Sequence, residues 1–296
     1  MRTTRYTPLL VLNLLLGASA LHAETVLERV AGGGKLIIAH RESSIPFSYL
    51  DGNKKPVGYA LDLCLKLADA VQKKVGVKAM PVEFLMVTSA NRISVIETGK
   101  ADLECGSTTN NAERRQKVGF TIPHFITGAR LLVRANSTVE RIEDLNGKNL
   151  VSTKGSTPLK AAEQANRERL LGVNILEAPD HAKAVEMVEN SAAEAFVMDD
   201  VLLFGLASNR PNPAALKVVG KFLTTEPLAI MLPKSDPEFK KVVDTEMRRL
   251  IQSGEIYPIY AKWFSKPIPP NNQALNMPIS YLLKDFWKYP TDIVPF

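Results

Sequence analysis

The sequence has few of the residues with which proteins bind metals or carry out catalysis. It contains only 2 cysteines and 4 histidines, and these form no His-Glu-x-x-His or Cys-x-x-Cys pattern. No Gly-x-Ser-x-Gly turn is present to expose a nucleophilic serine. Glycines 32–34 precede a predicted strand instead of joining a strand to a helix, so they do not resemble a phosphate-binding loop. We therefore expect no metal, no cofactor and no enzymatic activity.

Long apolar runs are also missing. The stretch at residues 9–16 is about 8 residues long, well short of the ~20 that a membrane-spanning helix needs. Arg2 and Arg5 precede this stretch, and small residues follow it at 18–20 and 21–23. This arrangement is typical of a secretory signal, so we expect residues 1–23 to be a cleaved signal peptide and the mature chain to be periplasmic.

Clusters of charge of one sign are absent. The formal net charge is +6, but the basic residues are scattered, without an aromatic-interleaved basic patch. Such a surface helps to attract anions and does not indicate nucleic-acid binding.

The two cysteines lie in apolar patterns. Cys64 belongs to a predicted helix and Cys105 to an apolar run. We expect two buried free thiols, because free cysteine often behaves as a small core residue. A disulfide is the alternative, and it would require the Cα atoms to lie within about 7 Å of each other.

Strands and helices alternate in two successive units. Such alternation predicts α/β architecture, in which mostly parallel sheets carry helices on both faces and ligands bind at the carboxyl ends of the strands. In the first unit we expect strands at 35–40, 82–87 and 101–106 and helices at 59–75 and 89–98. In the second we expect strands at 149–153, 174–178 and 195–199 and helices at 158–171 and 182–190.

The mature chain is long enough for two domains. We expect one lobe from residues 24–128 together with 228–296, and a second from residues 129–227. Apolar extended segments at 129–134 and 228–232 could cross between the lobes. The tail after residue 267 should wrap the first lobe.

Polar residues follow several predicted strands, where a ligand site is expected. Arg41 follows the first strand, and Ser107 and Thr109 follow the third. Thr157 is predicted to be the N-cap of the helix after strand 149–153, with Pro158 as its first helical residue. The free N–H groups of such a helix start attract a carboxylate or phosphate.

Several motifs resemble those of type II periplasmic amino-acid-binding proteins. They are Gly-Tyr-Ala-Leu-Asp at 58–62, Gly-Lys-Ala-Asp at 99–102 and Phe-Thr-Ile-Pro at 120–123. Longer blocks at 40–49, 104–111 and 196–200 resemble the glutamate/aspartate-binding proteins of ABC transporters, within solute-binding protein family 3. The resemblance implies two lobes, each a mostly parallel sheet flanked by helices, joined by two hinge strands.

The resemblance also implies a ligand site and partners. The partners would be L-glutamate or L-aspartate and the inner-membrane permease subunits of an ABC transporter, with the protein a monomer. The α-carboxylate would be bound by Arg114, Ser107, Thr109 and Thr157, the ammonium by Asp199, and the side-chain carboxylate by Arg41, Ser89, Arg92 and His181.

Other functions remain open at this stage. A binder of a neutral amino acid such as glutamine would lack a second carboxylate for Arg41 and Arg92 to bind. A dehydratase-like enzyme on the same fold would need an acid/base pair aimed at a reactive carbon. The sensing domain of a receptor would be followed by a transmembrane helix or a signalling domain, and the sequence shows neither after residue 250.

Overall fold

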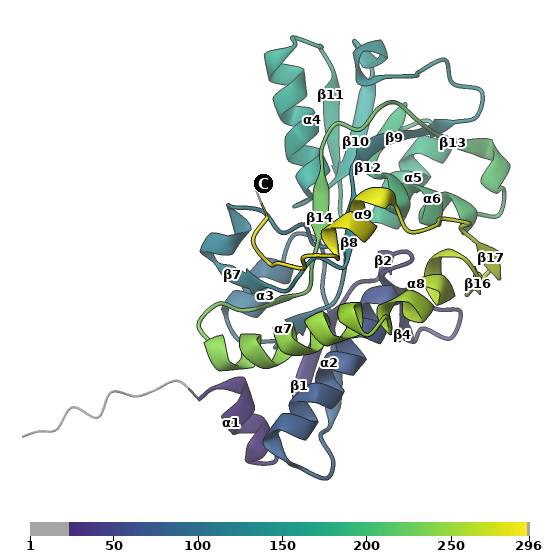
Figure 1. Cartoon of the computed structure of the whole chain (residues 1–296). Coiled ribbons are helices and arrows are strands. Elements are labelled where there is room, and N and C mark those ends of the chain that lie inside the picture. The colour runs from purple at the N-terminus through teal and green to yellow at the C-terminus, as the bar shows by residue number, and fades with distance from the viewer. Residues whose placement is uncertain (1–23, 295–296) are drawn as a thin grey trace, which may run out of the picture.

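Two five-stranded sheets organise the chain in the computed structural model, which describes residues 24–294 (Figure 1). The predicted signal peptide, residues 1–23, lies outside the described residues. The first sheet has the order β5 (Val82–Met86), β1 (Leu36–His40), β6 (Leu103–Glu104), β15 (Met231–Pro233) and β7 (Val118–Phe120). The second has the order β11 (Asn174–Ala178), β10 (Asn149–Thr153), β12 (Ala195–Asp199), β9 (Ala129–Arg134) and β13 (Leu216–Val219).

Both sheets are mixed. In the first, β1 runs parallel to β5 and β6, whereas β15 is antiparallel to β6 and β7. In the second, β10 runs parallel to β11 and β12, whereas β9 is antiparallel to β12 and β13. The predicted α/β class is confirmed, and the carboxyl ends of β1, β6, β10 and β12 are the edges at which a ligand site is expected.

The chain crosses between the sheets at a short antiparallel pair, β8 (Phe125–Thr127) with β14 (Glu226–Leu228). The predicted crossing segments, 129–134 and 228–232, were placed a few residues too far along the chain. Segment 129–134 is instead β9 of the second sheet, because its apolar residues are buried between β12 and β13. The lobe boundaries at residues 128 and 228 stay a prediction.

Helices flank both sheets. Those near the first are α1 (Val26–Ala31), α2 (Tyr59–Val75), α3 (Arg92–Glu97), α7 (Pro237–Gln252), α8 (Ile256–Phe264) and α9 (Tyr281–Phe286). Those near the second are α4 (Thr157–Glu168), α5 (His181–Glu189) and α6 (Asp200–Ser208). Short 3₁₀ helices lie at Arg114–Gln116, Ile142–Leu145 and Pro213–Ala215, and short strands are β2 (Ser43–Ser44), β3 (Ser48–Leu50), β4 (Pro56–Val57), β16 (Pro267–Ile268) and β17 (Gln273–Ala274).

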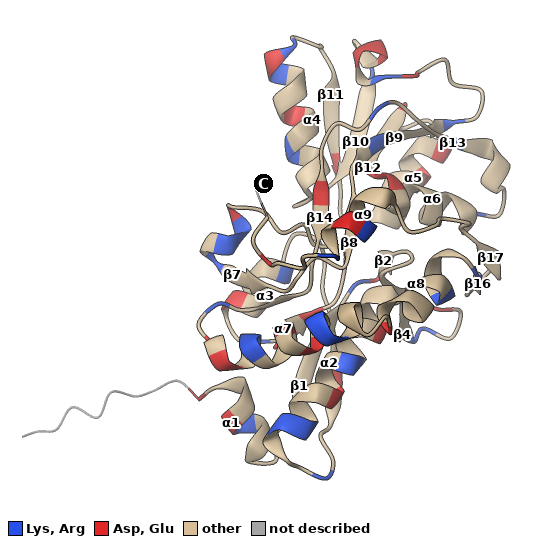
Figure 2. Ribbon diagram, viewed as in Figure 1, with Lys and Arg blue, Asp and Glu red and all other residues tan. Residues whose placement is uncertain are grey.

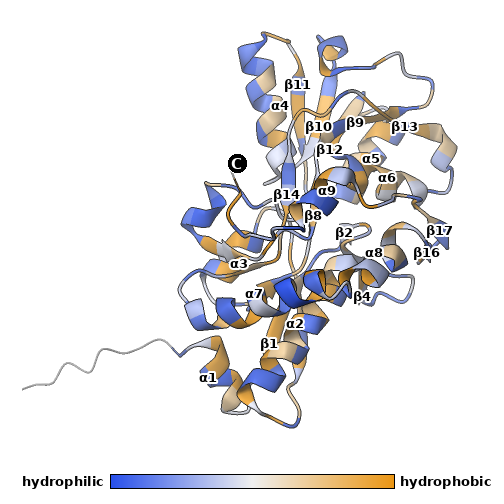
Figure 3. Cartoon of the chain, viewed as in Figure 1, coloured by the Kyte–Doolittle hydropathy of each residue, from blue (hydrophilic) through white to orange (hydrophobic). Residues whose placement is uncertain are grey.

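Helix α2 shows how local pattern and packing agree. Its residues Cys64, Leu67, Ala68 and Val71 recur at helical spacing and are buried. The helix ends at Val75 and is capped by Gly76, which adopts a left-handed conformation that suits glycine. Hydrophobic residues dominate β1 (Figure 3), whereas charges of both signs are interspersed along the helices (Figure 2). Within residues 24–294, no helix combines the length and the apolar character needed to cross a membrane.

The two cysteines are disulfide-bonded, so the expected free thiols were wrong. The Cα atoms of Cys64 and Cys105 lie 6.3 Å apart, and both residues are fully buried. The bond ties α2 to the segment that follows β6. That segment continues directly into Gly106 and Ser107, at the edge where a ligand site is expected.

The C-terminal tail packs beside the crossing strands. The indole Nε1 of Trp287 donates a hydrogen bond to the carbonyl of Pro123 (3.2 Å), and Lys240 forms an ion pair with Asp292 (2.8 Å). The tail also reaches the end of α6, where the Asn271 side chain donates to the Asn209 carbonyl (3.0 Å). It therefore contacts elements beside both sheets, not only the first as expected.

A histidine buried in the core should make the protein less stable in mild acid. His124 is fully buried, neither ring nitrogen has a hydrogen-bond partner among the described residues, and burial lowers its pKa to about 3. Below the ordinary pKa of 6.5 the unfolded chain binds a proton that the folded protein does not, so stability falls as the pH falls. Between pH 7 and pH 5 this residue should lower the free energy of unfolding by about 2 kcal/mol.

Chemical denaturation of the wild type and of His124→Leu at both pH values measures this effect. The variant should lose about 2 kcal/mol less than the wild type between the two pH values. Equal losses would contradict the assignment of this pH dependence to His124.

Candidate ligand-binding site

Four of the predicted site residues share an unusual property. Each is a buried polar side chain with at least one atom that has no hydrogen-bond partner within residues 24–294. These atoms are Nε and Nη1 of Arg41, Nε of Arg92, Nε2 of His181 and Oδ1 of Asp199. Because an unsatisfied buried polar atom is costly, such a group of atoms indicates a place that a polar ligand completes.

Arg41 follows β1 and is held from two sides. Its backbone N–H donates to the Ser48 hydroxyl (2.9 Å), and its Nη2 donates to the Ser89 hydroxyl (2.5 Å). Burial lowers the pKa of its guanidinium to about 9, and the nearby charge of Arg92 acts in the same direction. The group stays charged at neutral pH, and two of its nitrogens are left for an anion.

Arg114 opens a short 3₁₀ helix and contacts segments beside both sheets. Its Nη1 donates to the Thr109 carbonyl (2.9 Å) and its Nη2 to the Gly155 carbonyl (3.3 Å). Burial lowers its pKa to about 9, with a further contribution from Arg92. Burial likewise lowers the pKa of Arg92. Three buried guanidiniums that repel one another form a strong anion site, because a carboxylate can accept two hydrogen bonds from one planar guanidinium fork.

His181 begins α5 as a neutral imidazole. Burial holds its pKa well below the usual value, and Arg41 and Arg92 add to this effect. Its Nδ1 lies 2.7 Å from the Thr153 hydroxyl. A hydroxyl that donates to Nδ1 places the imidazole proton on Nε2, where it can donate to an anion.

Asp199 ends β12 and is the acidic pole of the site. Burial holds its pKa well above the usual value, and the charges of Glu226 and Asp200 act in the same direction. Arg92 and Arg114 oppose this rise. A cation placed beside Oδ1 would favour the ionised carboxylate.

Thr157 does not cap α4, contrary to the prediction. The N-cap is Ser156, whose hydroxyl accepts a hydrogen bond from the Leu159 N–H (3.2 Å), and Thr157 is the first helical residue. The hydroxyl of Thr157 is thereby freed from capping. It lies 3.0 Å from the Thr109 hydroxyl and donates to the Glu226 carboxylate (2.7 Å).

Ser107 and two further carboxylates complete the group. Ser107 is buried, with its hydroxyl 3.4 Å from that of Ser44. Glu104 and Glu226 are buried and were not among the predicted site residues. Glu104 is the first residue of the block 104–111, so the resemblance of that block could have identified it. Its negative charge acts on the guanidiniums of Arg41, Arg92 and Arg114. Nothing in the sequence marks Glu226, because its position depends on the pairing of β14 with β8.

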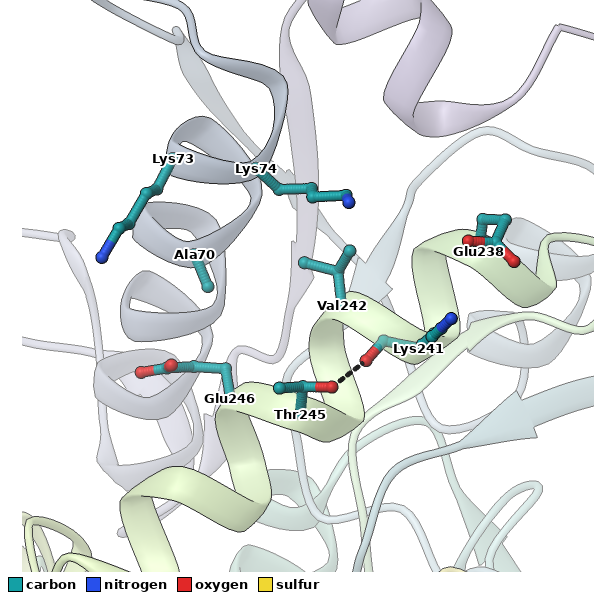
Figure 4. A pocket seen from close by; sticks show the side chains of 8 residues that line it. All are labelled: Ala70, Lys73, Lys74, Glu238, Lys241, Val242, Thr245 and Glu246. Atoms are coloured by element: carbon teal, nitrogen blue, oxygen red, sulfur yellow. Dashed lines mark hydrogen bonds between the residues drawn. The ribbon is translucent and has the colours of Figure 1, made fainter.

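A separate groove lies between α2 and α7 (Figure 4). Five of its eight lining residues are lysines or glutamates. It is lined by Ala70, Lys73, Lys74, Glu238, Lys241, Val242, Thr245 and Glu246, none of which is a predicted site residue.

Comparison with known proteins identifies relatives of this chain. Residues 36–266 match the family model described as bacterial extracellular solute-binding proteins, family 3. The L-glutamate/L-aspartate-binding protein of Pseudomonas aeruginosa is 40% identical over 267 residues, 90% of this chain and 88% of that protein. The glutamate/aspartate import solute-binding protein of Salmonella typhimurium is 38% identical over 293 residues, 97% of this chain and 96% of that protein.

A solved structure gives the same result for the fold. An ancestral amino acid-binding protein, described as a precursor of cyclohexadienyl dehydratase, superimposes with a TM-score of 0.68 at 29% identity. The match covers 80% of this chain and 98% of that one. The two-lobed type II fold expected from the sequence is therefore confirmed.

Proposed function

Because the chain belongs to the bacterial extracellular solute-binding proteins of family 3, we propose that it captures L-glutamate or L-aspartate in the periplasm and delivers the amino acid to the permease of an ABC transporter. The supporting observation is the set of unpartnered buried atoms on Arg41, Arg92, His181 and Asp199. Guanidiniums and a neutral imidazole complement two carboxylates, and the aspartate complements an ammonium.

The two ends of the ligand are assigned to different residues. Arg114 and Ser107 bind the α-carboxylate, and Asp199 binds the ammonium. Arg41, Arg92 and His181 bind the side-chain carboxylate, with Ser89 holding Arg41 in place (2.5 Å). The protein acts as an exported monomer of two lobes, residues 24–128 with 228–296 and residues 129–227, after removal of residues 1–23.

We propose that the protein binds its ligand without altering it. The similarity to a dehydratase precursor makes an enzyme the second candidate. Catalysis of that kind needs an acid and a base at a reactive carbon, whereas the titratable side chains of this site are arranged by charge around the ends of a ligand. The relatives of high identity are named as binding proteins.

Calorimetric titration with a panel of amino acids tests the proposal. L-glutamate or L-aspartate should bind more tightly than L-glutamine, because glutamine leaves part of the guanidinium cluster without an anionic partner. Tighter binding of glutamine would favour the neutral-ligand alternative. Chromatography of the recovered ligand should return it unchanged, and a new product would favour an enzyme.

Ligand binding should close the two lobes. Arg41 and Arg114 lie on one lobe, and His181 and Asp199 on the other, so a ligand that contacts both favours the closed state. In the described structure, Gly205 of α6 packs against the backbone of Ile45 across the lobes. A Cβ added at Gly205 would lie 2.5 Å from the Ile45 carbonyl oxygen, too close for full closure.

Small-angle scattering of the wild type should show a smaller radius of gyration with ligand than without. Gly205→Ala should bind about tenfold more weakly, because overpacking costs about 1 to 3 kcal/mol. The matched control is Gly52→Ala, whose Cβ would meet Pro270 at an ordinary 3.7 Å. If ligand binds but the radius of gyration does not decrease, or if Gly205→Ala and Gly52→Ala bind the ligand equally tightly, the proposed closure contact is wrong.

A further inference from the structure

Glu226 is a buried carboxylate at the meeting point of the two sheets. It begins β14 in the crossing pair and is only 2% exposed. Its Oε2 accepts hydrogen bonds from the hydroxyls of Thr109 (2.6 Å) and Thr157 (2.7 Å). Thr109 follows β6 of the first sheet and Thr157 begins α4 beside the second, so Glu226 bonds one hydroxyl from each side of the site.

These hydrogen bonds determine what the two hydroxyls can offer a ligand. A threonine hydroxyl has one proton to donate and two lone pairs with which to accept. The hydroxyls of Thr109 and Thr157 lie 3.0 Å apart, and each is within hydrogen-bond distance of Glu226. With both protons donated to the Glu226 carboxylate, neither hydroxyl has a proton left for a ligand. The hydroxyls can then only accept, which suits an ammonium and does not suit a carboxylate.

We propose that Glu226 is a specificity-determining residue that makes the site require an α-ammonium group. Its carboxylate accepts hydrogen bonds from the hydroxyls of Thr109 and Thr157. The lone pairs of both hydroxyls then face the ammonium that Asp199 also binds. This inference rests on the proposed function, and it moves the two threonines from the carboxylate end of the ligand to the ammonium end. The α-carboxylate is left to Arg114 and Ser107.

The electrostatics of the site agree with this placement. The charge of Glu226 contributes to the raised pKa of Asp199, so the two carboxylates are close enough to affect each other. Neighbouring buried carboxylates are stabilised in their charged forms by a shared cation. The charge of Glu226 also acts on Arg92 and Arg114, where it opposes the lowering of the pKa of each guanidinium by burial.

The test compares L-glutamate with glutarate, the same dicarboxylate without an ammonium. Wild type and Glu226→Gln are titrated with both by calorimetry, with displacement titration for the weaker ligand. A glutamine side chain brings an N–H donor, which releases a threonine proton toward the ligand. Glu226→Gln should bind glutamate about 30-fold or more weakly, while its affinity for glutarate stays the same or rises.

The matched control is Glu104→Gln, which also removes one buried carboxylate near the guanidiniums. Glu104 accepts from Thr108 (2.7 Å) and not from the hydroxyl pair. Its change should therefore alter the ratio of glutamate to glutarate affinity far less than Glu226→Gln does. If Glu104→Gln lowered that ratio as much as Glu226→Gln does, the effect would be a general one of charge, and the proposal would be overturned.

Variants of Thr157 keep the test decisive if Glu226→Gln folds poorly or glutarate binds too weakly to measure. Thr157→Val removes the hydroxyl at nearly constant shape and should weaken glutamate binding, and Thr157→Ser should restore it. The double variant Glu226→Gln with Thr157→Val should bind no more weakly than Glu226→Gln alone, because both changes break one interaction. Additive losses, or equal losses of glutamate and glutarate, would overturn the inference. A wild type that binds no acidic amino acid would overturn the proposed function itself.

Discussion

Arg114→Met should weaken the binding of L-glutamate, L-aspartate and L-glutamine alike, by about 30-fold to several thousand-fold. All three ligands carry the α-carboxylate that we assign to Arg114. Its guanidinium is buried and fixed by the carbonyls of Thr109 and Gly155. Removal of one member of a buried, hydrogen-bonded charge pair costs about 2 to 5 kcal/mol, because the other charge is left unpaired.

The control for Arg114→Met is Lys117→Met. Lys117 lies three residues away on the exposed face, so this change removes the same charge outside the site. Calorimetry should show nearly wild-type affinities for Lys117→Met, and thermal unfolding should show that both variants fold. If Arg114→Met lost glutamate and aspartate but kept glutamine, the residue would bind the side-chain carboxylate instead.

Local pattern predicted several regular elements to the residue, three of them strands of the second sheet. The bounds of β10, β11 and β12 are those expected from the sequence, as are those of α2. Helix α3 begins at Arg92 instead of residue 89, because the side chains of Asn91 and Thr88 hydrogen-bond to each other's backbone N–H groups and close a turn there. Such competition between side chain and backbone is hard to weigh from sequence alone.

Features that depend on tertiary distance could not be predicted. The Cys64–Cys105 disulfide requires α2 to lie against the end of β6, and no spacing along the chain reveals that contact. The same holds for Glu226, which enters the site only because β14 pairs with β8. Strand ends alone pointed to Arg41, Ser107, Thr109 and Thr157, and the other predicted site residues and all the ligand roles came from resemblance to a family. The structure adds the carboxylates and hydrogen bonds that set how those residues are charged and oriented.

Arg41→Met should lower the selectivity for glutamate over glutamine as well as the affinity for both. We assign Arg41 to the side-chain carboxylate, which glutamine replaces with a neutral amide. In the variant, glutamate should lose about 2 to 5 kcal/mol of binding free energy because its distal carboxylate is stranded in a dry pocket. Glutamine should lose only about 1 to 3 kcal/mol, the cost of an uncharged group left imperfectly paired. The ratio of glutamate to glutamine affinity should therefore fall, whereas Arg114→Met should leave that ratio nearly constant.

Arg92 determines how far the ratio of glutamate to glutamine affinity falls in Arg41→Met, and changing it extends the test. Its Nε is also buried without a partner among the described residues, so it can share the distal carboxylate with Arg41. If it does, the double variant Arg41→Met with Arg92→Met should lower the ratio further than either single change. Arg41→Lys, which keeps the charge but loses the planar fork, should give an intermediate ratio. Equal proportional losses of glutamate and glutamine in both the Arg41 and the Arg114 variants would show that the two ends of the ligand are wrongly assigned, even if the protein binds amino acids.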